Sequence, residues 1–183
     1  ARPPLGVRCL FTLARGHVAE NDDNAPVGKE PSDIRPVLIS DEMVAGMKLT
    51  DPTGRFRVGA ALKEALLNAV YRGNLEISFQ DMQDARSGLA LGQGDDLVRK
   101  RREASPYRER RVHVFVAIDP QEARFVVRDE GPGFEPVKIP AAGQPGSLDP
   151  DTGRGLVLIR AFMDEVTFND KGNEITLIKR RES

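Results

Sequence analysis

Residues 58–74 read Val-Gly-Ala-Ala-Leu-Lys-Glu-Ala-Leu-Leu-Asn-Ala-Val-Tyr-Arg-Gly-Asn, and they are the most informative part of the chain. Their apolar residues form one stripe at helical spacing: Leu62, Leu66, Ala69 and Val70. This pattern predicts an amphipathic helix from about Arg55 to Arg72. We expect the pair Gly73-Asn74 to end it, since these residue types are common at helix C-termini.

Glu64, Asn68 and Arg72 follow one another at intervals of four residues, so a helix would project all three from one face. A carboxylate beside a carboxamide suits Mg²⁺, which takes few protein oxygens and keeps water and phosphate oxygens as its other ligands. Asn68 could be a metal ligand, and Glu64 could accept a proton from an attacking hydroxyl. Taken alone, the spacing is more typical of a solvated helix face.

A second polar segment, Asp129-Glu130-Gly131-Pro132-Gly133-Phe134, comes at the end of a predicted strand. A carboxylate at a strand end can accept a hydrogen bond from an amino group, such as the exocyclic amine of adenine. Gly131 and Gly133 would allow a sharp turn and the close approach of a planar ligand. The alternative is a plain turn, because Asp-x-Gly is ordinary turn chemistry.

A third segment, Gly153-Arg154-Gly155-Leu156, opens a predicted helix. Backbone amides at a helix N-terminus bind phosphate, and Arg154 could add a charged contact. The alternative is a helix that merely begins in a glycine-containing loop. Neither a phosphate-binding Gly-x-x-x-x-Gly-Lys loop nor a complete dinucleotide fingerprint occurs in the chain.

The remaining segments alternate between strand-like and helix-like patterns. Strands are expected at residues 7–13, 112–118, 123–128, 165–169 and 173–180, the last four in two hairpins. Further helices are expected at residues 33–47 and 155–163, a turn at 51–54, and loops at 14–32 and 135–152. This order predicts an α+β fold, a two-layer sandwich of one mixed or antiparallel sheet with helices on one face.

Composition narrows the class of protein. The chain has 183 residues and a net charge of −1, which is typical of one globular domain and gives no global attraction to nucleic acid or membranes. Its one cysteine, Cys9, indicates a reducing, cytoplasmic setting, and no apolar run approaches the roughly 18 residues of a membrane span. A basic run at 99–111 is interrupted by glutamates, so we expect a solvated face or a docking site for an acidic partner. The chain begins at Ala1 without a methionine, so we expect a piece excised from a longer signalling protein.

The three polar segments together resemble the Bergerat-fold (GHKL) ATPases, which include gyrase, histidine kinases and mismatch-repair proteins. Within that group the chain is most similar to the anti-sigma-factor serine/threonine kinases. Residues 58–74 resemble the N box, 125–134 the Asp-x-Gly-x-Gly box, and 153–180 the final box and closing hairpin. The resemblance covers residues 33–181, within a single ATP-binding domain spanning 1–183; residues 14–32 and 75–111 are insert-like.

The resemblance implies a role for each matching residue. Glu64 would be the general base and Asn68 the Mg²⁺ ligand. Asp129 would bind the adenine amine, supported through water by Thr176. Residues 135–152 would form an ATP lid, and the other nucleotide-binding residues would be Arg72, Gly131, Gly133, Phe134, Gly153, Arg154, Gly155 and Leu156.

Three functions stay open at this point. The first is an ATP- and Mg²⁺-dependent kinase that phosphorylates serine or threonine on a regulatory partner such as an anti-sigma antagonist. The second is an ATP-dependent interaction module without phosphotransfer, binding a sigma factor or another partner; Arg72, where the family usually has histidine, and the insert-like segments favour it. The third is the ATPase part of a sensor histidine kinase or a response-regulator output domain beside a receiver domain. Homodimerisation is also left open.

Overall fold

The computed structural model describes residues 7–14, 17–20, 50–78, 80–81, 95–134 and 153–181. Six strands form one sheet in the order β2-β1-β3-β4-β6-β5, and every neighbouring pair is antiparallel. The strands are β1 (Val7–Ala14), β2 (His17–Glu20), β3 (Arg111–Ile118), β4 (Glu122–Asp129), β5 (Glu165–Phe168) and β6 (Glu174–Arg180). The expected α+β architecture is therefore confirmed, and the sheet is antiparallel rather than mixed.

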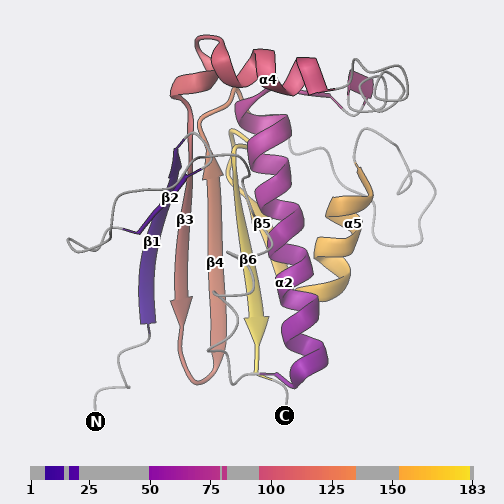
Figure 1. Cartoon of the computed structure of the whole chain (residues 1–183). Coiled ribbons are helices and arrows are strands. Elements are labelled where there is room, and N and C mark those ends of the chain that lie inside the picture. The colour runs from indigo at the N-terminus through magenta and orange to yellow at the C-terminus, as the bar shows by residue number, and fades with distance from the viewer. Residues whose placement is uncertain are drawn as a thin grey trace.

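Two helices, α2 (Pro52–Leu67) and α5 (Gly153–Phe162), pack against each other on one face of the sheet (Figure 1). At its C-terminal end α2 continues into a π-helical segment, η1 (Asn68–Asn74). A shorter helix, α4 (Asp95–Glu103), crosses one end of the sheet and is followed by a 3₁₀ turn, η2 (Tyr107–Glu109), that leads into β3 (Figure 1). The C-terminal ends of α2 and β4 meet at this same end of the molecule.

The core lies between the sheet and the two long helices. Along β4 the residues alternate in burial, with Ala123, Phe125 and Val127 buried between more exposed neighbours, as a sheet covered on one face requires. From the helix side, the apolar stripe of α2 and η1 supplies fully buried side chains such as Leu62 and Leu66. Asp129 continues the inward series of β4, so alternation alone directs its carboxyl toward the helices.

The sequence-based boundaries hold for both hairpins, for β1 and for α5 within two residues. Residues 17–20, expected in a surface loop, instead form β2 and pair with β1. The expected turn at 51–54 is the start of α2: the Asp51 carboxylate accepts a hydrogen bond of 2.6 Å from the Gly54 amide, and Pro52 takes the first helical position. The residues expected to form a turn therefore form the N-cap of a helix.

The expected helix at 33–47 and the expected loop at 135–152 lie outside the described residues. Across the described part of the chain, no helix combines the length and the apolar character that crossing a membrane would require.

The core packing predicts the effect of truncating α2. Leu66→Ala removes a side chain with no exposed surface, so it should lower the free energy of unfolding by about 3 kcal/mol. Phe56→Ala, on the same helix but 76% exposed, should change it by less than about 0.5 kcal/mol. Urea denaturation of both variants measures this; equal losses would contradict the assigned orientation of α2.

Candidate functional site

The first group of site residues lies where α2 meets the N-terminal turn of α5. Glu64 and Asn68 are one helical turn apart and half-buried. A Cβ atom on Gly155 would lie 2.7 Å from Glu64 Oε2 and 3.6 Å from Asn68 Nδ2, so only glycine lets the α5 backbone come this close. The structure therefore brings the first and third polar segments of the sequence into contact.

The second group surrounds Asp129 at the end of β4. Its carboxyl is 9% exposed, and Oδ1 accepts a hydrogen bond of 2.8 Å from the Gly131 amide. The other oxygen, Oδ2, has no hydrogen-bond donor among the described residues, so it can accept one from a ligand. Burial raises the pKa of this carboxyl from 3.8 to about 6, despite the opposing effect of the Gly131 hydrogen bond and the charge of Lys171.

Two glycines make room for this carboxyl. A Cβ on Gly73, in η1, would overlap the carboxyl group of Asp129, and a Cβ on Gly131 would overlap the Gly73 carbonyl. The pair Gly73-Asn74 was expected to end the helix, and η1 does end at Asn74, but the positive φ that follows belongs to Glu76 and not to the glycine. The glycine is required by the close approach of the helix to Asp129 and not by the helix terminus.

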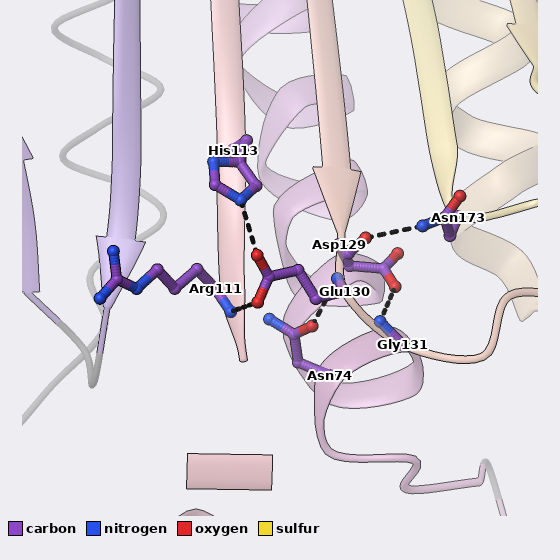
Figure 2. A network of polar contacts seen from close by, with 7 residues as sticks. All are labelled: Asn74, Arg111, His113, Asp129, Glu130, Gly131 and Asn173. Atoms are coloured by element: carbon purple, nitrogen blue, oxygen red, sulfur yellow. Dashed lines mark hydrogen bonds and ion pairs between the residues drawn. The ribbon is translucent and has the colours of Figure 1, made fainter. Parts of the chain in front are cut away.

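A polar network holds the residue after Asp129 in place (Figure 2). The Glu130 amide donates a 2.9 Å hydrogen bond to Oδ1 of Asn74 in η1. Its carboxylate accepts one of 2.9 Å from the Arg111 amide and lies 3.0 Å from His113 Nε2, and these contacts lower the pKa of Glu130. The network therefore ties β3, β4 and η1 together beside the buried carboxyl.

Asn173, not Thr176, is the β6-side residue in contact with Asp129. Asn173 Nδ2 donates a 2.8 Å hydrogen bond to the Asp129 carbonyl, and the Asp129 amide donates one of 3.0 Å to the Asn173 carbonyl (Figure 2). Thr176 pairs with Val126, one step out of phase with the inward residues of β4, so it lies on the opposite face of the sheet. Asn74 and Asn173 were missed, because the β4–β6 pairing that brings Asn173 to Asp129 joins strands far apart in the chain.

The loop after Asp129 packs on the turn between β5 and β6. Gly133 has φ +81° and approaches the Lys171 carbonyl so closely that a Cβ would overlap it. Phe134 is 45% exposed and its ring meets that of Phe168 edge-on, with 5.4 Å between the ring centres. The structure thus places Phe134 beside β5.

The remaining predicted residues are placed as follows. Arg72 lies half-buried within η1, one π-helical turn after Asn68. Gly153 and Arg154 form the first turn of α5, and Leu156 packs against the core.

The two groups form one candidate site along a continuous helix. Glu64 and Gly73 are nine residues apart, which at helical rise separates them by at most about 13 Å, the scale of a nucleoside triphosphate. Within the described ranges, no cluster of three or more His, Cys, Asp and Glu side chains could bind a metal by itself. A hard cation at Asn68 would therefore need ligands from water or phosphate.

Comparison with known proteins agrees with this geometry. The family model for the histidine kinase-like ATPase domain matches residues 28–179, which is most of the chain and includes both groups of site residues. A search of curated proteins found no match. From the extent of the family match, the chain belongs to the histidine kinase-like ATPase domain family.

Proposed function

We propose that this domain binds Mg-ATP and transfers the γ-phosphoryl group to a serine or threonine of a regulatory partner protein, as in anti-sigma partner switching. The observation that carries the proposal is the contact of Gly155 with Glu64 and Asn68. It places a candidate base, a candidate metal ligand and a helix N-terminus at one point.

Recognition of the adenine ring rests on Asp129. A buried carboxylate with one oxygen held by Gly131 and the other without a protein donor among the described residues suits the exocyclic amine of adenine. Guanine presents a carbonyl oxygen at that position, which a carboxylate would repel. The site should therefore prefer adenine nucleotides.

Recognition of the phosphates rests on α5 and Asn68. The first turn of the ten-residue helix α5 lies beside Glu64 and Asn68, so phosphates bound at its N-terminal amides would be close to both side chains. The amide oxygen of Asn68 would hold Mg²⁺ without adding charge, while phosphate and water oxygens complete its shell. Gly155 keeps the space between the helices free of a side chain.

The chemistry then needs little from the protein beyond position and one proton acceptor. Bound ATP supplies the phosphoryl group, and the Glu64 carboxylate takes the proton of the attacking hydroxyl. Because Glu64 lies next to Asn68, the hydroxyl and the phosphates would be held on the same side of α2.

A second candidate is an ATP-dependent interaction module without transfer. Its support is Arg72 of η1, which stands where the family usually has histidine. Such a module would bind Mg-ATP through the same residues and leave Glu64 without a catalytic role. The Glu64 variant below separates the two.

Asn68→Ala should remove the magnesium dependence of nucleotide binding. Calorimetric titration with a non-hydrolysable ATP analogue should show at least about a tenfold loss of affinity in Mg²⁺, with metal-free affinity nearly unchanged. Lys63→Ala, the half-buried neighbour of Glu64 on α2, is the control. Wild-type magnesium dependence in Asn68→Ala would rule out the ligand assignment.

Glu64→Gln should retain ATP and lose phosphoryl transfer. We expect the affinity for the ATP analogue to stay within about twofold of wild type. The rate of γ-phosphoryl transfer from ATP, to water or to a serine peptide, should fall roughly 100-fold. Glu103→Gln, exposed on α4, should match wild type in both measurements. A Glu64→Gln enzyme with the wild-type rate would remove Glu64 as base, and a wild type that binds without any transfer would favour the interaction module.

Asp129→Asn should weaken the recognition of adenine and raise the free energy of unfolding above a pH of about 6. The folded pKa of about 6 exceeds the value of 3.8 in an unperturbed carboxyl, so the folded state binds this proton more tightly than the unfolded chain. Stability is therefore lost as pH rises from about 4 to 6, and the cost of the buried charge above that range is about 3 kcal/mol. The variant should unfold at higher urea than wild type at pH 8 and lose that advantage at pH 4, while its preference for ATP over GTP disappears. An undiminished ATP preference would contradict the adenine assignment.

A further inference from the structure

The basic segment before β3 is engaged with the protein itself. The guanidinium carbons of Arg101 in α4 and Arg110 lie 4.6 Å and 5.2 Å from the centre of the Tyr107 ring, within cation–π range. Arg108, between them, is exposed and pairs with the adjacent Glu109. Of these arginines, Arg110 extends away from its own segment toward η1.

Arg110 caps the end of η1. Its Nη1 donates a 2.8 Å hydrogen bond to the Asn74 carbonyl, one of the last carbonyls of the helix, which have no partner within it. A cation at this position also complements the negative end of the helix dipole. The side chain is only 17% exposed, so water screens these interactions weakly.

The same guanidinium fixes the chain just beyond the helix. Nη1 lies 2.7 Å from Oε1 of Glu76, which has φ +49°. Glycine or asparagine usually takes this left-handed position, and a glutamate there is conformationally costly. The ion pair with Arg110 offsets part of that cost and fixes where η1 stops.

The end of η1 is also where the site is held together. Asn74 is buried and accepts the hydrogen bond from the Glu130 amide, and Gly73 before it is packed against the Asp129 carboxyl. A shift of the Asn74 backbone would therefore move both the helix and the strand end that surround Asp129.

We propose that Arg110 is a positioning residue for nucleotide binding, acting through Asn74 to hold Gly73 and Glu130 around Asp129. This inference rests on the proposed function, because it concerns the binding of adenine at Asp129. Arg110 lies outside the predicted site residues. It also gives the segment 95–111 a role within the site, where the sequence suggested a solvated or docking face.

The charge of Arg110 affects the pH midpoint of nucleotide binding, which a loss of packing alone would leave unchanged. Arg110 and Lys171 are the cations that lower the pKa of Asp129 against the effect of burial. The neighbouring charged side chains, Arg72 of η1 and Glu130, stay unchanged in the variants used. Loss of Arg110 should therefore shift the pH midpoint of nucleotide binding upward, because Asp129 must lose its proton to accept the amine.

The test compares Arg110→Ala and Arg110→Lys with Arg108→Ala in the full chain. At about neutral pH, ADP affinity should fall roughly tenfold in Arg110→Ala and stay within about twofold of wild type in Arg108→Ala. Arg110→Lys should recover part of the loss, because lysine restores the charge but not the planar fork. Wild-type ADP affinity and an unshifted pH midpoint in Arg110→Ala would overturn the proposal.

A second measurement needs no nucleotide. In the ligand-free protein, amide hydrogen exchange at Glu130 and Gly131 should be faster by about tenfold in Arg110→Ala than in Arg108→Ala, because both amides bond to groups that Arg110 positions. Unchanged exchange would overturn the positioning role. If Arg110→Ala does not fold, Arg110→Lys, which keeps the charge and loses the planar fork that caps Asn74, should show the same faster exchange to a smaller degree. A wild type that fails to bind ADP would instead overturn the proposed function.

Discussion

The buried carboxyl of Asp129 constrains everything around it. A carboxylate that loses most of its water needs a donor and close, well-fitted neighbours. Here the Gly131 amide donates to it, the Gly73 backbone packs against it, and Asn173 holds the backbone of Asp129 in place. Each requires a different element to end or turn at the same place. β4 must stop at Asp129, η1 must approach without a side chain, and the closing hairpin must keep its register. Burial raises the pKa of Asp129 to about 6, so the charged carboxylate destabilises the ligand-free domain above that pH.

The π-helical segment allows one helix to contribute both to the core and to the site. The α2 stripe must face the sheet to bury Leu62 and Leu66, while the end of the same helix must reach Asp129 and Glu130. A change from α to π geometry alters the helical phase over one turn, and such changes are frequent at functional sites. Arg110 stabilises the end of this segment from outside, so the segment before β3 belongs physically to the site.

Much of the fold follows from local patterns. Alternation identified both hairpins, the apolar stripe identified α2, and the glycine pair identified the start of α5. The boundaries that were mistaken have specific causes. Asp51-Pro52-Thr53-Gly54 has the composition of a turn and of a helix cap alike, and only the direction of the following chain distinguishes them. Residues 17–20 form a strand because β1 offers an edge to pair with, which no local pattern in that segment announces.

The sequence by itself determined the residue types that the site needs: a carboxylate and an amide one helical turn apart, an aspartate at a strand end, and glycines at the closest approaches. These follow from periodicity and from chemistry within a few residues. Only the tertiary structure decided which residues meet across elements. It placed Asn173 beside Asp129 and turned Thr176 to the other face, because strand register is set by long-range pairing. It also brought Arg110 to Asn74, because the capping of this helix depends on a contact between residues far apart in the chain.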